Sequence, residues 1–147
     1  LAVVDCGAGH IQTSIVELGA GVCEPLATAF STESAGDEIT YRLAHHLASR
    51  FFQKTGADIL NEKAAFRRLL EACQRAKLDL SLTHTAQINI PYLNLDDTSP
   101  LHLDEEIYRQ TLESMLAPTE TICRLQLDQV LSESGKAKTE IDALLIT

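Results

Sequence analysis

Residues 1–18 read LAVVDCGAGHIQTSIVEL, and they set the first expectation about the fold. A short apolar run ends at Asp5, and Gly7 and Gly9 follow before an alternating apolar and polar segment begins. Alternation with a period of two is typical of β-strands, and paired glycines are typical of tight turns. The stretch therefore predicts two strands joined by a hairpin. On these residues alone, the turn is either a phosphate-binding loop or a tight hairpin without a ligand.

The segments that follow predict one more strand and two helices. Residues 21–28 (GVCEPLAT) predict a third strand of an antiparallel meander, with Pro25 at an edge or a bulge because proline has no N–H. Apolar residues recur every four positions over residues 39–51, which predicts an amphipathic helix that ends near Gly56. A second helix is predicted over residues 61–80.

The second half of the chain returns to strands and helices. Residues 85–95 (TAQINIPYLNL) predict a strand, and residues 96–100 (DDTSP) predict a loop. A helical stretch is expected from about Tyr108, and Pro118 must kink it or start a new helix. Residues 141–147 (IDALLIT) predict a buried strand, so we expect the domain to continue beyond them.

Composition and charge exclude several classes of protein. The 147 residues carry a net charge of −9, which repels a phosphate backbone and argues against nucleic acid as a partner. No apolar run approaches the roughly 20 residues that cross a bilayer, so we expect no membrane partner. The chain begins with Leu rather than Met, which favours a segment of a longer protein.

The cysteines are far apart in the sequence and form no Cys-x-x-Cys pair. This spacing gives little support to a metal cluster or a redox motif, and it predicts reduced, buried thiols in an intracellular protein. The four residues are Cys6, Cys23, Cys73 and Cys123.

Several motifs together resemble one protein family. A strand, Asp-x-Gly-x-Gly and a second strand resemble the phosphate hairpin of actin-like ATPases and sugar kinases. AFRRLLEACQRAKLDLS at residues 65–81 resembles a helix of 70-kilodalton heat-shock chaperones that reads roughly RRLRxACExAKxxLS. INIPYL at 88–93 and SPLHL at 99–103 resemble the DnaK-type, bacterial and mitochondrial branch. IYRQTLE at 107–113 resembles LTRxxFE, and residues 141–147 resemble the strand before a Gly-Gly phosphate loop.

The resemblance implies an α/β fold, namely lobe II of an actin-like ATPase domain. Residues 1–34 and 117–147 would form a base subdomain with a ribonuclease H-like sheet, helices and the phosphate hairpin. Residues 35–116 would form a tip subdomain of helices and a small sheet. By this resemblance the full-length parent binds ATP or ADP with Mg between two lobes. The fragment, which lacks the first lobe, is expected to bind no nucleotide and to hydrolyse no ATP.

The hairpin keeps three of the family's phosphate-site residues. By resemblance, Asp5 matches the catalytic acid that helps to hold the metal, its water shell and the attacking water. Gly7 and Gly9 match glycines that bring backbone N–H groups close to the phosphates.

Three other hairpin positions depart from the family pattern. Ala8 replaces the middle glycine, His10 replaces a threonine on the phosphate side, and Gln12 replaces an acid near the cation site. A neutral amide contributes no negative charge toward a hard cation. Ala8 and His10 still match nucleotide-binding positions, and no residue is assigned as a metal ligand.

The resemblance also implies contacts to the adenosine. Lys77 and Ser81 match residues that touch ribose and base, and both are expected to line the groove that holds the hairpin. Gln74 replaces a glutamate, and Leu78 replaces an arginine whose guanidinium covers the adenine. Gly36 belongs to a segment that matches the family's Gly-Gly-Glu-Asp, one glycine short.

Three hypotheses about function follow. The first is the second lobe of an ATP-driven chaperone in the bacterial cytoplasm or in mitochondria. Its implied partners are a J-domain co-chaperone, a nucleotide-exchange factor at the tip, and unfolded client peptides bound by a missing domain. The second is a diverged chaperone-like protein with a regulatory role and no hydrolysis. The third is a small-molecule kinase of the actin superfamily, which the motifs at 65–81 and 88–113 disfavour.

Overall fold

The computed structural model describes residues 1–93 and 100–147. The predicted strand end at residues 94–95 and most of the predicted loop at residues 96–100 lie outside these ranges. The chain divides into two compact units: unit 1 comprises Leu1–Glu38 and Ala117–Thr147, and unit 2 comprises Ile39–Leu116. The fold is a mixed α/β one, as the sequence predicts.

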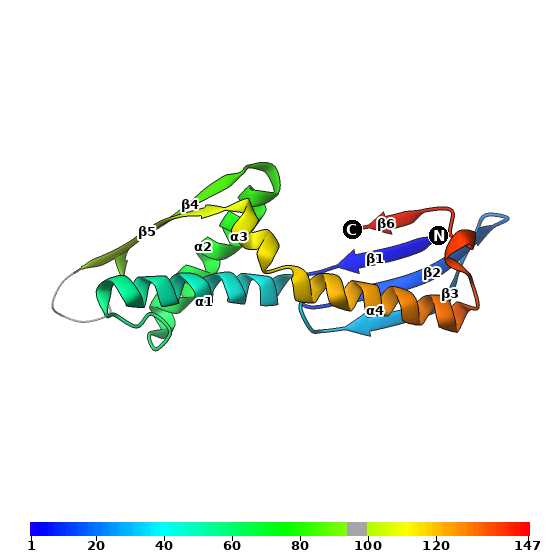
Figure 1. The fold of residues 1–147 in the computed structure, drawn as a ribbon, viewed down its shortest axis with the longest axis horizontal. Helices are drawn as coiled ribbons and strands as arrows, with labels where there is room; N and C mark the ends of the chain where they lie inside the picture. The colour runs from blue at the N-terminus through cyan, green and yellow to red at the C-terminus, as the bar shows by residue number, and fades with distance from the viewer. Residues whose placement is uncertain (94–99) are drawn as a thin grey trace. The chain divides into compact units, whose positions relative to one another are not determined.

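Unit 1 is a four-stranded sheet with one long helix. The strands lie in the order β3-β2-β1-β6 (Figure 1). β1 and β2 are antiparallel, as are β2 and β3, and β6 runs parallel to β1. The antiparallel meander is therefore confirmed. The elements of unit 1 are β1 (Ala2–Cys6), β2 (Ile11–Gly19), β3 (Val22–Ser31), α4 (Ala117–Ser134), a 3₁₀ turn (Lys138–Glu140) and β6 (Leu144–Ile146).

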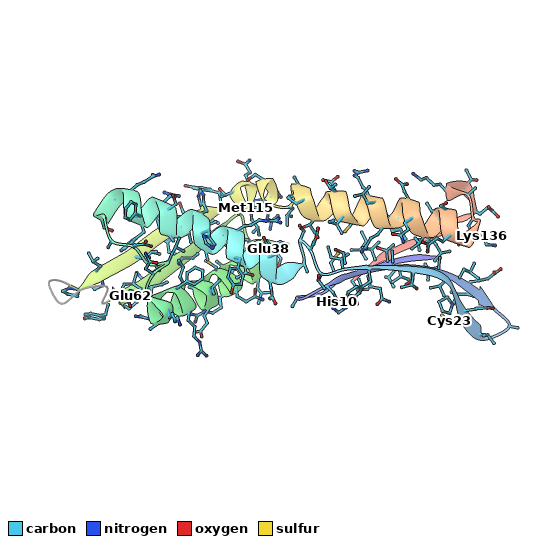
Figure 2. All side chains as sticks on the ribbon, turned by 90° about the horizontal axis from the view of Figure 1, so that it is seen from below. His10, Cys23, Glu38, Glu62, Met115 and Lys136 are labelled. Carbon is cyan, nitrogen blue, oxygen red and sulfur yellow. The ribbon has the colours of Figure 1, made fainter. Side chains whose placement is uncertain are left out.

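The core of unit 1 forms because alternate strand residues point toward α4. Figure 2 shows α4 lying along one face of the sheet. Ile15 and Val130 are almost completely buried in one cluster, and Val4 and Ile11 are buried in a second. Strand side chains alternate between the two faces, so Asp5 and Gln12 lie on the face away from α4.

Pro25 lies where the sequence predicts it. β3 is an edge strand, and the register between β2 and β3 shifts so that Ile15 pairs with Ala27 while Val16 pairs with Pro25. The shift leaves one extra residue in β3, which is a bulge. An edge strand with a bulge tolerates the missing N–H of proline, so this prediction is confirmed.

The prediction of a buried strand at residues 141–147 is only half right. The strand β6 forms, but Leu144, Leu145 and Ile146 are 53%, 49% and 67% exposed. A continuous apolar run is the pattern of a strand covered on both faces, whereas β6 is an edge strand whose three side chains remain accessible.

Unit 2 packs helices on a two-stranded antiparallel sheet. The two predicted long helices and the predicted strand at residue 85 are confirmed, and Gly56, with a φ of +76°, follows the end of the first helix. The strand β5 was not predicted. The elements are α1 (Gly36–Thr55), whose first turn belongs to unit 1, α2 (Lys63–Leu82), β4 (Thr85–Leu93), β5 (Leu101–Tyr108) and α3 (Arg109–Ser114).

The core of unit 2 lies between the helices and the small sheet. Fully buried side chains of α1 and α2 meet the inward-facing residues of β4 and β5. These buried residues include Leu43, Leu47, Leu69, Cys73, Leu80, Ile88, Leu103 and Ile107.

Pro118 starts a new helix, which is one of the two outcomes that the sequence predicts. α3 ends at Ser114, and Pro118 is the second residue of α4, where its missing N–H breaks no helical hydrogen bond. Leu125 is an apolar residue of α4 that is nevertheless 61% exposed. Within the described ranges, no helix has both the length and the apolar character needed to cross a membrane.

Candidate functional site

The hairpin turn at residues 7–10 is held by the start of α1. The Gly36 N–H donates to the Gly7 carbonyl at 3.0 Å, and the Asp37 N–H donates to the Ala8 carbonyl at 2.8 Å. The first N–H groups of a helix have no partner within the helix, and here the turn supplies two acceptors. The structure therefore brings Gly36 to the hairpin within unit 1.

The two glycines of the turn have different surroundings. A Cβ on Gly7 would lie 3.3 Å from the His10 carbonyl oxygen, so backbone packing explains this glycine. A Cβ on Gly9 would meet nothing within 4 Å. Gly7, Ala8 and Gly9 are not among the described residues with positive φ, so Ala8 carries no backbone strain. Among the residues that the structure describes, none requires a glycine at position 9.

Asp5 and Gln12 lie opposite each other on neighbouring strands. The two residues are register partners in the β1–β2 ladder, which puts both side chains on the exposed face of the sheet. The Thr147 hydroxyl donates to Asp5 Oδ1 at 3.1 Å. A carboxylate and an amide thus project from adjacent strands just before and after the turn.

His10 stacks on Phe30 next to these two side chains. The ring centroids are 5.3 Å apart and the planes are inclined by 29°. Phe30 is the register partner of Gln12 on β3 and is 61% exposed. Figure 2 shows His10 at the hairpin end of the sheet. The stack holds the imidazole beside the turn on an accessible surface.

In unit 2, the predicted adenosine-side residues share one face of α2. Each of Gln74, Lys77, Leu78 and Ser81 lies three residues from one of the others and four residues from another. Leu78 is 59% exposed, and the Ser81 hydroxyl donates to the Leu78 carbonyl at 2.6 Å. The sequence spacing alone is sufficient to predict this shared face.

A threonine of α1 joins this face. The Lys77 ammonium donates to Thr40 Oγ1 at 3.0 Å, and the Thr40 hydroxyl donates to Gln74 Oε1 at 2.8 Å. Thr40 is buried, with 6% of its surface exposed, and its hydrogen bonds hold Gln74 and Lys77 between α1 and α2. Sequence reasoning missed Thr40, because it lies 34 positions before Gln74 and no local pattern connects them.

The cysteines differ from the prediction of buried thiols. Cys73 is buried, but Cys6 and Cys23 are exposed, and Cys6 Sγ lies 3.9 Å from Cys123 Sγ. Partial burial, and then the neighbouring Cys123 thiol, raise the pKa of Cys6 to about 11. In the part of the chain that the structure describes, no group of three or more His, Cys, Asp or Glu side chains could hold a metal ion.

Comparison with known proteins identifies the family of the chain. The sequence model of the Hsp70 protein family matches residues 1–147. Among curated relatives, "Chaperone protein DnaK" of Methanothermobacter thermautotrophicus is 32% identical over 146 residues, or 99% of this chain and 24% of that protein. The proteins of the same name from Prochlorococcus marinus and Trieres chinensis are 33% and 31% identical over 146 residues.

The family match includes both the hairpin and the face of α2. The hypothesis of a small-molecule kinase is therefore not needed to explain the sequence motifs. The chain spans about a quarter of the length of the curated relatives it matches. Because the family model covers every residue of the chain, the chain belongs to the Hsp70 protein family.

Proposed function

We propose that this chain forms the second lobe of the ATP-binding domain of an ATP-driven heat-shock chaperone. The hairpin at Asp5–Gln12 contacts the phosphates, and the α2 face at Gln74–Ser81 contacts the adenosine. In this assignment unit 1 is the base subdomain and unit 2 the tip. The chain-long family match and the local geometry of both segments support the proposal.

The open space beside Gly9 is the single observation on which the proposed phosphate role depends. Gly7 is explained by its tight approach to the His10 carbonyl, whereas Gly9 has open space on the side where a Cβ would lie. A glycine that the fold does not need, placed in an exposed turn, allows a ligand to approach the backbone closely. Successive backbone N–H groups of such a turn bind anions.

The residues of the hairpin fit magnesium–ATP in part. The exposed Asp5 carboxylate can accept hydrogen bonds from metal-bound water and orient the attacking water. The hydrogen bond from the Thr147 hydroxyl positions the Oδ1 atom of Asp5. The magnesium ion, when bound, neutralises charge on the phosphates. Gln12 offers an oxygen and no charge, and the His10 ring stacks on Phe30 beside the turn that would bind the phosphates.

The α2 face fits a nucleoside. Lys77 is directed by its hydrogen bond to Thr40, so that its ammonium position is set before any ligand binds. Exposed Leu78 offers an apolar surface for a purine ring, and the Ser81 hydroxyl is on the same side of the helix. Dispersion contact by Leu78 replaces the stacking that a guanidinium would provide.

For the whole protein, we propose nucleotide-driven chaperone action inside the cell. Hydrolysis in one domain would control a peptide-binding domain that this chain does not include. A J-domain co-chaperone and a nucleotide-exchange factor are its proposed partners, the latter at unit 2.

The substitution Gly9→Ala tests the phosphate role in the full-length protein. Because a Cβ at Gly9 meets nothing in the fold, the variant should keep the wild-type melting temperature. It should lose at least about tenfold in ATP affinity, since the added methyl group occupies the space that the phosphate needs. Isothermal titration calorimetry and thermal unfolding measure the two effects.

Gly19→Ala is the matched control. Gly19 also has nothing within 4 Å and no positive φ, but it lies at the other end of β2. The control should bind ATP as the wild type does. Equal ATP affinity of Gly9→Ala and wild type would refute phosphate binding at this turn.

The pairing of Asp5 with Gln12 favours a second candidate function, a chaperone-like protein that binds nucleotide and hydrolyses it slowly or not at all. The exposed face of the hairpin presents one carboxylate where the family has two. Electrostatic alignment of metal and phosphates is the main catalytic resource in phosphoryl transfer. Without a carboxylate at position 12, the hairpin aligns the metal and the phosphates less strongly, although the fold is unchanged.

The double variant Gln12→Asp with His10→Thr tests this second candidate in the full-length protein. Restoring the carboxylate and the hydroxyl should raise ATP turnover by at least about tenfold in single-turnover measurements. His10→Thr alone is the control for the lost stack on Phe30. A double variant with wild-type turnover would contradict the idea that these two positions limit hydrolysis.

A further inference from the structure

Two cysteines from distant parts of the sequence meet beside the hairpin. Cys6 Sγ lies 3.9 Å from Cys123 Sγ, although 117 positions separate the residues. Cys6 is the last residue of β1, and Cys123 lies in the first half of α4. Both belong to unit 1, so their contact is a property of one compact unit.

The register of the sheet explains why the thiols meet. Val4 and Cys6 are two residues apart on β1 and therefore point to the same face of the sheet. The buried cluster that contains Val4 packs against Cys123 and its helix neighbour Ile122. The side chain of Cys6 consequently faces α4, at the open end of the interface where the core gives way to solvent.

The other two cysteines lack this arrangement. Cys73 lies in the core of unit 2 and is fully buried. Cys23 is exposed, and Figure 2 shows it at the end of the sheet away from His10. Cys6 and Cys123 are therefore the pair of thiols that the fold brings into contact within the described residues.

We propose that Cys6 and Cys123 are a redox-modification site that forms an intramolecular disulfide when a peroxide oxidises the chain. A disulfide bond is about 2.05 Å long, so the two sulfur atoms must approach by about 1.9 Å. Rotation of two short side chains at an accessible position can supply this movement. The bond would fasten the end of β1, where the hairpin begins, to α4.

The reaction balances with one hydrogen peroxide molecule for each disulfide. One thiol releases its proton, and its thiolate attacks the peroxide, whose O–O bond breaks to give a sulfenic acid and hydroxide. The hydroxide takes up the released proton and becomes water. The second thiol then attacks the sulfenic sulfur and the S–O bond breaks. The departing hydroxide takes up the proton of this thiol and leaves as a second water. The two thiols are oxidised by two electrons, and the peroxide is reduced to two water molecules. Because the raised pKa of Cys6 limits the thiolate, the reaction should be slow at neutral pH.

The test uses the purified 147-residue chain at low concentration. After treatment with hydrogen peroxide, the wild-type monomer should be about 2 Da lighter, and a thiol-blocking reagent added afterwards should label only two of its four cysteines. Cys23→Ser, the control, should show the same loss of mass. Cys6→Ser and Cys123→Ser should not show it, and the corresponding alanine variants should behave in the same way.

Three results would overturn the proposal. The first is a wild-type chain that keeps four free thiols under conditions that oxidise a small-molecule thiol. The second is a loss of 2 Da that persists in Cys6→Ser or Cys123→Ser, because another pair would then be responsible. The third is oxidation that yields only disulfide-linked dimers. The wild-type mass is decisive by itself, even where a variant fails to fold.

Discussion

The Cys73 thiol lies in the core of unit 2, among side chains of α1, α2 and the small sheet. Burial raises the pKa of this thiol from its ordinary value of 9.0 to about 12. Between these two values the unfolded chain releases the Cys73 proton while the native chain keeps it. The native state then binds more protons than the unfolded state, so its stability falls as the pH rises through this window.

We therefore predict a steeper alkaline loss of stability in the wild type than in Cys73→Ala. Between about pH 9 and pH 12, the free energy of unfolding of the wild type should fall faster by up to about 1.4 kcal/mol per pH unit. Urea unfolding at a series of pH values measures both slopes. Cys23→Ala, at an exposed position, should keep the wild-type slope. Parallel slopes for Cys73→Ala and wild type would contradict the prediction.

At the scale of single residues, the sequence and the structure agree best where local chemistry decides. Asp5 and Gln12 could be placed on adjacent strands from the alternation of residues 1–18. The difference between Gly7 and Gly9 could not be predicted, because it depends on where the His10 carbonyl lies in three dimensions.

Among the elements, β5 shows how pairing overrides local pattern. Its residues 101–108 (LHLDEEIY) contain three consecutive acids, which favour a solvated segment. Pairing with β4 nevertheless makes a strand in which Leu103, Glu105 and Ile107 all face the core. The central acid is 6% exposed, and cations from α1 compensate its charge.

Glu105 yields a prediction about how α1 is tied to β5. Arg50 Nη2 lies 2.9 Å from one carboxylate oxygen of Glu105, and Lys54 contacts the other. Replacing both cations by alanine leaves a buried carboxylate without compensation and should cost about 1–3 kcal/mol of stability. Glu105→Gln should cost less, because the half-exposed cations can return to water.

Urea unfolding followed by circular dichroism tests this ranking. The control is Arg67→Ala, which removes a pair whose side chains are 82% and 60% exposed, and it should change stability by less than about 0.5 kcal/mol. A larger loss from Glu105→Gln than from the double cation variant would show that the ranking is wrong.

At the scale of the whole molecule, one edge of the unit 1 sheet is both apolar and exposed. β6 is the edge strand next to β1, and its three large apolar side chains are between 49% and 67% exposed. An exposed, apolar edge strand presents unpaired backbone groups to other chains. The isolated chain is therefore expected to self-associate through β6.

A charge on this strand should weaken the association. We predict that Leu145→Lys raises the dissociation constant for self-association of the 147-residue chain by at least about tenfold, because the edge strand must bury a charge to pair. Sedimentation equilibrium measures the constant. Leu125→Lys, on α4 at a position that is 61% exposed against 49% for Leu145, should leave it unchanged. If both variants associate as the wild type does, the association does not use β6.

Local patterns in the sequence determined the meander, the two long helices of unit 2 and the place of the helix break at Pro118, because hydrophobic periodicity and proline geometry act over a few residues. The motifs at residues 5–12 and 65–81 likewise sufficed to predict the family. Only the tertiary structure decided that β5 is a strand, that β6 is exposed, that Thr40 orients Lys77 and that Cys6 meets Cys123. Each of these depends on contacts between residues far apart in the chain, which no local pattern encodes.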